Sequence, residues 1–208
     1  MKLQLALDRL TQDECLTILE ETSTSIDLIE IGTGVIKEYG MSIIERIKSV
    51  YPNITIVADM KTCDAGRSEA EQAFQAGADI TTVMAFAHDA TIKEMLQVAK
   101  SHNKRVMVDL LGITSSKRIQ QLQSLGVDLV SLHIGKDMQG DGKNATADLF
   151  RLLTDANEFE VSVAGGIDEA SLPQFLPHNP DIFIVGGAIT KARDRAEVAK
   201  RLKGMISP

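Results

Sequence analysis

The chain has 208 residues, of which 44% are hydrophobic and 25% are charged, a composition typical of a folded protein. Its 22 basic and 29 acidic residues give a net charge of −7, which argues against an extended nucleic-acid-binding surface but not against a local anion pocket. No run approaches the roughly 18 apolar residues of a membrane span, and Asp8 comes too early for a signal peptide. We therefore expect a cytoplasmic protein that binds neither nucleic acid nor a membrane.

Short apolar runs rich in β-branched residues recur along the chain, and each ends at a charged residue or a glycine. Such runs are typical of parallel strands buried on both faces. We predict eight strands, at 3–8, 28–32, 55–61, 79–85, 105–111, 128–135, 160–166 and 182–187. Helical spacing separates them: within residues 90–100, Ile92, Met95, Leu96 and Ala99 share one face.

This alternation without a break in composition predicts an α/β fold, a compact (β/α)₈ TIM barrel that forms a single domain over residues 1–208. Glycines such as the one in 76–79 end a helix just before the next strand. A doubly wound open sheet is the alternative, but residues 7–10 lack its usual glycine-rich turn. The longer connections 33–39 and 136–144 are expected at the carboxyl ends of the strands, where barrel enzymes place their active sites.

Polar residues end most of the predicted strands, where side chains point into the mouth of a barrel. They are Asp8, Glu30, Asp59, Lys61, Asp109 and His133, with Asp64 just beyond the third strand. Carboxylates within apolar runs are costly to bury unless they pair with a cation or bind a metal. A helix cap or a local ion pair explains any one of these acids equally well, but their convergence favours an active site.

The pattern over residues 59–64 is the most informative in the chain. Asp59 and Lys61 are two apart in a strand and therefore point the same way, while Asp64 follows in a loop. A simple salt bridge is one interpretation. The other is that Asp59 and Glu30, on the neighbouring strand, supply oxygen ligands for Mg²⁺, and that Lys61 faces a developing oxyanion.

Two glycine pairs follow the last two predicted strands, Gly165–Gly166 and Gly186–Gly187. One such pair is commonly only a tight turn. Two pairs at these places favour a phosphate site, because the corresponding loops of a barrel offer backbone N–H donors to phosphate. Thr190 or Arg193 could add side-chain contacts.

His133 is the histidine of interest, because it lies late in a buried strand. A hydrogen-bonded core histidine is the simple interpretation, and a general acid or base is the more specific one. His88, His102 and His178 fall in loops or at helix ends, where we expect them to be solvated. Cys63 has no histidine beside it, so we expect a structural role.

Taken together, these residues resemble the orotidine-5′-phosphate decarboxylase suprafamily, whose third strand carries Asp-x-Lys-x-x-Asp, here Asp59, Lys61 and Asp64. The resemblance spans essentially the whole chain. Glu30, together with His133 and the segment Gly142-Lys143-Asn144, narrows it to the 3-hexulose-6-phosphate synthases and their sister family, the 3-keto-L-gulonate-6-phosphate decarboxylases.

The resemblance implies a lyase of the ribulose monophosphate pathway, an aldolase that condenses formaldehyde with D-ribulose 5-phosphate. It implies Mg²⁺ on Glu30 and Asp59, which stabilises an enediolate. It further implies that His133 is the base that removes the C1 proton and that Lys61 stabilises the changing oxyanion charge.

The remaining residues receive roles from the same resemblance. Asp8 and Asp109 would orient sugar hydroxyls and Lys61, and the two glycine pairs would hold the phosphate. In the suprafamily the last aspartate of the motif enters the neighbouring subunit's site, so Asp64 implies a homodimer with shared active sites.

The sequence departs from the family pattern at Lys136, where many synthases have tyrosine and the decarboxylases have arginine. Gly187, where the decarboxylases have arginine, favours the synthases. Decarboxylation of 3-keto-L-gulonate 6-phosphate through a similar enediolate therefore stays open as an alternative. A barrel that binds a sugar phosphate without turning it over is a third possibility, although such a binder has no need of the charged 59–64 motif.

Overall fold

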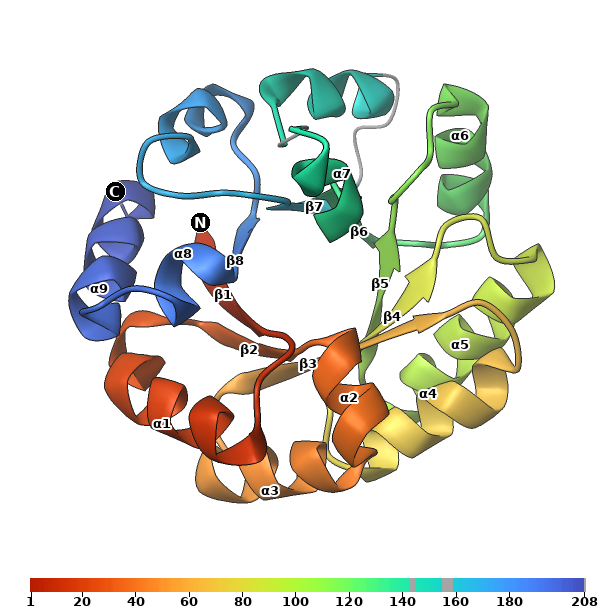
Figure 1. The fold of residues 1–208 in the computed structure, drawn as a ribbon. Helices are drawn as coiled ribbons and strands as arrows, with labels where there is room; N and C mark the ends of the chain where they lie inside the picture. The colour runs from red at the N-terminus through yellow and green to blue at the C-terminus, as the bar shows by residue number, and fades with distance from the viewer. Residues whose placement is uncertain (143–144, 155–158, 208) are drawn as a thin grey trace.

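The computed structural model describes residues 1–142, 145–154 and 159–207. Its strands are all parallel, each pairs with the next in the sequence, and β8 pairs with β1 to close a barrel. The strands are β1 (Lys2–Leu7), β2 (Leu28–Ile31), β3 (Thr55–Thr62), β4 (Ile80–Met84), β5 (Arg105–Asp109), β6 (Leu129–His133), β7 (Glu160–Ala164) and β8 (Ile182–Val185). The predicted (β/α)₈ barrel is confirmed (Figure 1).

Helices form a ring outside the barrel, and α2, α7 and α8 lie nearer its opening (Figure 1). The α-helices are α1 (Gln12–Thr22), α2 (Thr33–Tyr39), α3 (Ser42–Val50), α4 (Gly66–Gln75), α5 (Asp89–His102), α6 (Ser116–Ser124), α7 (Lys136–Gly140), α8 (Gly187–Thr190) and α9 (Arg195–Ile206). The 3₁₀ turns are η1 (Ser23–Ser25), η2 (Ala147–Leu153), η3 (Leu172–Gln174) and η4 (Leu176–His178). Within the described ranges, no helix is long and apolar enough to cross a membrane.

Both segments expected as long loops contain helices instead. Residues 33–39 form α2, and the connection after β6 begins with α7. The N-cap of each is a glycine in extended conformation: Gly32, directly after β2, and Gly135, two residues after β6. The chain therefore turns from strand to helix at the barrel rim without a loop. Lys143 and Asn144, part of the family segment, lie outside the described residues.

Most of the strands are slightly shorter than predicted, because the chain leaves the ladder at the barrel rim. Asp8, Gly165 and Gly186 lie one residue beyond β1, β7 and β8 rather than inside them. The predicted ends of helices are confirmed: Gly77, with φ 101°, follows α4, and Gly126, with φ 87°, follows α6. Both glycines have the positive φ that ends a helix without strain.

Side chains alternate between two apolar layers, as the period of a strand requires. The inner layer fills the barrel with Leu28, Val57, Ile80, Met107, Leu129, Ala164, Ile182 and Ile184. The outer layer packs the strands against the helices; its α5 part includes Ile92, Met95 and Ala99, with Leu96 partly buried. Towards the carboxyl ends the inward positions become polar, so the barrel is apolar below and polar at its mouth.

Candidate active site

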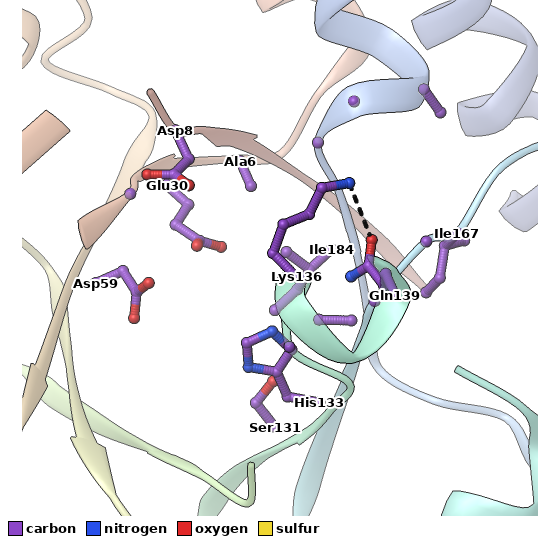
Figure 2. A pocket seen from close by; sticks show the side chains of 18 of the residues that line it. Ala6, Asp8, Glu30, Asp59, Ser131, His133, Lys136, Gln139, Ile167 and Ile184 are labelled. Carbon is purple, nitrogen blue, oxygen red and sulfur yellow. Dashed lines mark hydrogen bonds between the residues drawn. The ribbon is translucent and has the colours of Figure 1, made fainter. Parts of the chain in front are cut away.

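A cavity of about 1250 Å³ opens at the carboxyl ends of the strands. Nearly all residues predicted for the site line it: Asp8, Glu30, Asp59, Lys61, Asp109, His133, Gly165, Gly166, Gly186, Gly187 and Thr190. Figure 2 shows Asp8, Glu30 and Asp59 along one side of the cavity, facing Lys136 and His133. The structure therefore brings together residues that are far apart in the sequence.

Two of the predicted residues lie elsewhere. Asp64 is exposed and lines a separate shallow pocket at the first turns of α4 and α5. Arg193 follows α8 and, among the described residues, is not part of the cavity lining. Asp64 is two residues beyond the end of β3, and the turn into α4 carries its side chain away from the barrel mouth of its own chain.

Glu30 and Asp59 lie on neighbouring strands, β2 and β3, and their negative charges oppose each other. Loss of water contact and the charge of Asp59 raise the pKa of Glu30 to about 7. Gln4 donates from Nε2 to Glu30 Oε2 at 2.5 Å, while its own Oε1 is buried without a hydrogen-bond partner. A divalent cation between the two carboxylates would remove this repulsion.

The donor set fits Mg²⁺, which commonly uses one or two protein carboxylates and keeps its other positions for water and substrate oxygens. In the part of the chain that the structure describes, no group of three histidine, cysteine, aspartate or glutamate side chains is placed to hold a metal.

Lys61 connects the two carboxylates of β3 and β5. Its Nζ lies 3.0 Å from Asp59 Oδ2 and 2.9 Å from Asp109 Oδ2. Although burial alone lowers the pKa of Lys61, the charges of Asp59 and Asp109 raise it above its ordinary value. Lys61 is therefore a cation held in place, as a group that stabilises an oxyanion must be.

His133 approaches the same carboxylate, with its Nδ1 2.9 Å from Asp109 Oδ2. Although burial raises the pKa of Asp109, the hydrogen bond from His133 and the charges of His133 and Lys61 lower it to about 2. An ionised carboxylate only accepts hydrogen bonds, so Nδ1 carries the proton and Nε2 is left to exchange one. Burial lowers the pKa of His133, but its bond to Asp109 raises it to a net value above the ordinary one.

The backbone at Lys61 is irregular. Its φ is 48°, in the left-handed region that non-glycine residues seldom adopt. The pairing of β3 with β4 changes register here: Ala58 faces Thr81 and Thr62 faces Val83, so residues 59–61 face Thr82 alone. Backbone strain of this kind is concentrated at functional sites, where the surrounding structure holds it.

Asp8 links the end of β1 to the start of α2. Its Oδ1 accepts a 2.8 Å hydrogen bond from the backbone N–H of Gly34, and Arg9 lies 3.3 Å from its Oδ2. A Cβ at position 34 would come within 2.6 Å of that carboxylate oxygen, so a glycine is needed for the approach. Asp8 is thereby fixed at the cavity wall.

The two glycine pairs have different backbones: Gly165 and Gly166 have positive φ, whereas Gly186, with φ −110°, is the N-cap of α8 and Gly187 is its first residue. Gly165 and Gly166 have φ values of 120° and 74°, and a Cβ at Gly165 would meet Ile134 O at 2.6 Å. Among the backbone hydrogen bonds of the described turns and loops, none is donated by the N–H groups of Gly165, Gly166 or Gly187. Amides of this kind, at a cavity wall, are suited to bind phosphate oxygens.

Sequence reasoning missed several polar residues of the cavity and its wall. They are Gln4, Thr33, Thr82, Ser131 and Gln139. The sequence marks Lys136 only as a departure from the family pattern and does not predict its position in the cavity lining. The signal for Gln4, Thr82 and Ser131 was available, since each lies an even number of residues from an apolar or charged inward position on its strand. Lys136 Nζ donates to Gln139 Oε1 at 3.3 Å, both on α7 (Figure 2).

The other histidines and Cys63 lie outside this cavity. His88 caps α5 by accepting from the N–H of Ala90, His102 contacts Glu71 at 2.8 Å, and His178 stacks on Phe150. They lie in loops and at helix ends, as expected, but each has a local contact there. Cys63 is a free, exposed thiol.

Known proteins are similar to this chain in both sequence and structure. Residues 1–202 match the model of the orotidine 5′-phosphate decarboxylase / HUMPS family. A 3-hexulose-6-phosphate synthase of Bacillus subtilis is 38% identical over 99% of both chains. The crystal structure of 3-hexulose-6-phosphate synthase from Salmonella typhimurium covers 99% of this chain and 98% of its own, with a TM-score of 0.97 and 35% identity.

A second kind of enzyme is also similar in structure. A crystal structure of KGPDC from Streptococcus mutans, solved as a ligand complex, has a TM-score of 0.92 and 28% identity, and covers 99% of this chain and 96% of its own. The family model and the full-length relatives lead to one conclusion. The chain belongs to the orotidine 5′-phosphate decarboxylase / HUMPS family.

Proposed function

We propose that the chain is a Mg²⁺-dependent aldolase that joins formaldehyde to D-ribulose 5-phosphate and forms a 3-hexulose 6-phosphate. The observation that carries the proposal is the network of Asp59, Lys61, Asp109 and His133 beside Glu30, in a chain 38% identical to a 3-hexulose-6-phosphate synthase. The reaction balances in carbon, because a five-carbon ketose phosphate and a one-carbon aldehyde make a six-carbon ketose phosphate.

Glu30 and Asp59 would hold the Mg²⁺. When bound, the ion supplies Lewis acidity that makes the C1 proton of the ketose more acidic. Gln4 orients the Glu30 carboxylate from below, and the Lys61 ammonium balances the charge of Asp59. Burial and the charge of Asp59 raise the pKa of Glu30, and a cation held by the two carboxylates would offset both costs.

His133 would act as the base through Nε2, since Nδ1 is engaged by Asp109. Removal of the C1 proton leaves an enediolate, and its carbon then forms the new bond to the formaldehyde carbon. His133 would return the proton from Nε2 to the formaldehyde oxygen, which becomes the C1 hydroxyl of the hexulose. Lys61 stabilises the negative charge that moves between oxygens during these steps.

The substrate would extend across the cavity from the glycine loops after β7 and β8 to Lys61 and His133. The backbone amides of Gly165, Gly166 and Gly187 would bind the phosphate, with Gly186 shaping the same wall. Asp8, fixed by Gly34, would accept hydrogen bonds from sugar hydroxyls. In this pose C1 of the sugar would lie towards Lys61 and His133.

The proposal includes a homodimer whose sites are shared. Asp64 belongs to the motif of the catalytic strand, yet it is exposed and lies outside the cavity of its own chain. An aspartate supplied by the partner would complete the site from its open side.

Decarboxylation of 3-keto-L-gulonate 6-phosphate is the second candidate. The structural similarity to KGPDC supports it, as does Lys136, a cation that points into the cavity (Figure 2). Loss of CO₂ from that substrate leaves an enediolate of the same kind, so Lys61 could stabilise either reaction.

Formaldehyde consumption is the test. Purified protein with Mg²⁺ and ribulose 5-phosphate is expected to consume formaldehyde, and Glu30→Gln and Asp59→Asn should each lower kcat/KM by about 10²-fold or more. Asp13→Asn, at an exposed position on α1, is the control and should keep full activity. Release of CO₂ from 3-keto-L-gulonate 6-phosphate without formaldehyde consumption would assign the decarboxylase. If the protein catalyses neither reaction but binds the sugar phosphate tightly, it is a binding protein.

A further inference from the structure

Two threonine hydroxyls hold the Asp59 carboxylate from opposite sides. Thr82 donates from Oγ1 to Asp59 Oδ1 at 2.9 Å. Thr33 Oγ1 lies 2.8 Å from Asp59 Oδ2 and 2.7 Å from the Asp59 carbonyl oxygen, so its single proton is shared between these two acceptors. Asp59 and Thr82 are both buried, with 7% and 4% of their surfaces exposed. Water therefore competes little with these bonds, and the carboxylate has one preferred orientation.

Thr82 makes a second bond that Thr33 does not. Its Oγ1 accepts the backbone N–H of Lys61 at 2.9 Å. A hydroxyl has one proton to donate, and the ionised Asp59 can only accept, so the order is fixed as Lys61 N–H to Thr82 to Asp59. One hydroxyl thus connects the backbone of the cation to the side chain of the carboxylate.

The register explains why this bond is needed. Residues 59–61 of β3 face Thr82 alone on β4, so the regular ladder cannot pair the N–H of Lys61. An N–H that loses water contact without gaining a partner destabilises the folded chain. The Thr82 hydroxyl replaces the missing ladder partner at the residue whose φ is 48°.

We propose that Thr82 is a positioning residue that sets Asp59 and Lys61 together, so that metal ligand and oxyanion-stabilising cation keep one fixed relation. The inference rests on the proposed function for the roles of Asp59 and Lys61. Its structural part, the hydroxyl that supports the left-handed turn at Lys61, is independent of that function.

Thr82→Val tests the proposal, because valine keeps the branched shape and removes only the hydroxyl. Thr81→Val is the matched control: Thr81 is the adjacent, fully buried threonine of β4, and its hydroxyl contacts Ala58 O at 3.4 Å, away from the cavity. We expect kcat to fall about 10–100-fold in Thr82→Val, with KM less changed, and Thr82→Ser to restore most of it. Thr81→Val should stay close to wild type.

Amide hydrogen exchange at Lys61, followed by NMR, is the readout that does not depend on activity. The exchange rate should rise at least about tenfold in Thr82→Val and stay unchanged in Thr81→Val. Thr33→Val should weaken Mn²⁺ binding, measured by calorimetry as a substitute for Mg²⁺, without faster exchange at Lys61. If Thr82→Val does not fold, Thr82→Cys replaces the hydroxyl with a thiol, a weaker donor and acceptor at the same place, and exchange at Lys61 should again be faster than in Thr81→Val.

The outcomes distinguish the two proposals. Absence of divalent-cation binding and of turnover in the wild-type protein would overturn the proposed function, while the exchange data would still decide the role of Thr82. Equal activity and equal Lys61 exchange in Thr82→Val and Thr81→Val would overturn the positioning role, whatever reaction the enzyme catalyses.

Discussion

At the scale of single residues, Asp109 is the centre of the site's electrostatics. One of its oxygens, Oδ2, lies 2.9 Å from both Lys61 Nζ and His133 Nδ1, and the other accepts the backbone N–H of Leu111 at 2.8 Å. Its carboxylate therefore fixes the position of the cation and the tautomer of the histidine. Both effects depend on its negative charge, so they can be tested by removing the charge alone.

The pH dependence of the aldol reaction tests the role of His133. A base must be unprotonated, so kcat/KM should rise with pH through the pKa of His133, which Asp109 holds above the ordinary 6.5. In Asp109→Asn the supporting charge is lost, and the midpoint of the profile should move to lower pH while the maximal rate falls. Rate profiles in ribulose 5-phosphate and formaldehyde measure both effects.

Attribution of that midpoint requires a second variant. His133→Asn should remove the titration and leave a flat profile of low activity over the same range. A midpoint that is the same in wild type and Asp109→Asn, or that survives in His133→Asn, would show that another group is the base.

At the scale of elements, ion pairs tie strand ends together on the side of the barrel away from the cavity. Asp79, just before β4, accepts from Lys48 of α3 at 2.8 Å, from Lys104 before β5 at 2.6 Å and from the N–H of Ile56 in β3 at 2.9 Å. Its side chain is 23% exposed, so these bonds are only partly screened by water. Burial raises the pKa of Asp79, but the two lysines lower it below the ordinary 3.8 overall.

Asp79→Asn is therefore expected to destabilise the fold by about 1–3 kcal/mol at pH 7, measured by urea unfolding. Because the folded-state pKa is the lower one, the contribution is present above pH 3.8 and is lost as the pH falls through the folded-state pKa. The difference between variant and wild type should shrink in that range. Asp13→Asn, whose side chain is 90% exposed, should change stability little at any pH.

At the scale of the whole molecule, a barrel of 208 residues leaves little chain for closing the cavity. With a net charge of −7, the proposed phosphate recognition would depend on local groups, and the glycine loops offer backbone amides that need no basic surface. Cys63 and Asp64 are exposed just after β3, and Phe86, after β4, is 60% exposed. A second subunit on this side would cover these residues and bring Asp64 to a neighbouring site.

Complementation between two inactive variants tests this arrangement. Lys61→Ala and Asp64→Asn should each be inactive alone. If Asp64 acts in the partner's site, mixing after unfolding and refolding should restore about a quarter of wild-type activity, since half the dimers are mixed and each has one intact site. If mass spectrometry shows mixed dimers and activity is not recovered, Asp64 acts in the site of its own chain. If sedimentation shows that a monomer is active, the shared site is excluded.

The sequence by itself determined the barrel and most of the cavity lining. Short apolar runs rich in β-branched residues predict the strands, and Asp8, Glu30, Asp59, Asp109 and His133, at or near the ends of these runs, predict the edge where the groups meet. That inference holds because in a parallel barrel all carboxyl ends of the strands lie on one side. Local pattern is then sufficient to place distant residues together.

Only the tertiary structure decided which groups touch. The shared oxygen of Asp109, the bond from Gln4 to Glu30 and the hydroxyl of Thr82 depend on the register between strands. The left-handed conformation of Lys61 depends on it as well, since the change of register between β3 and β4 arises from two strands pairing and leaves no local signal in a non-glycine residue. Contacts across a barrel follow from how its strands are aligned, and that alignment is a property of the closed sheet rather than of any one segment.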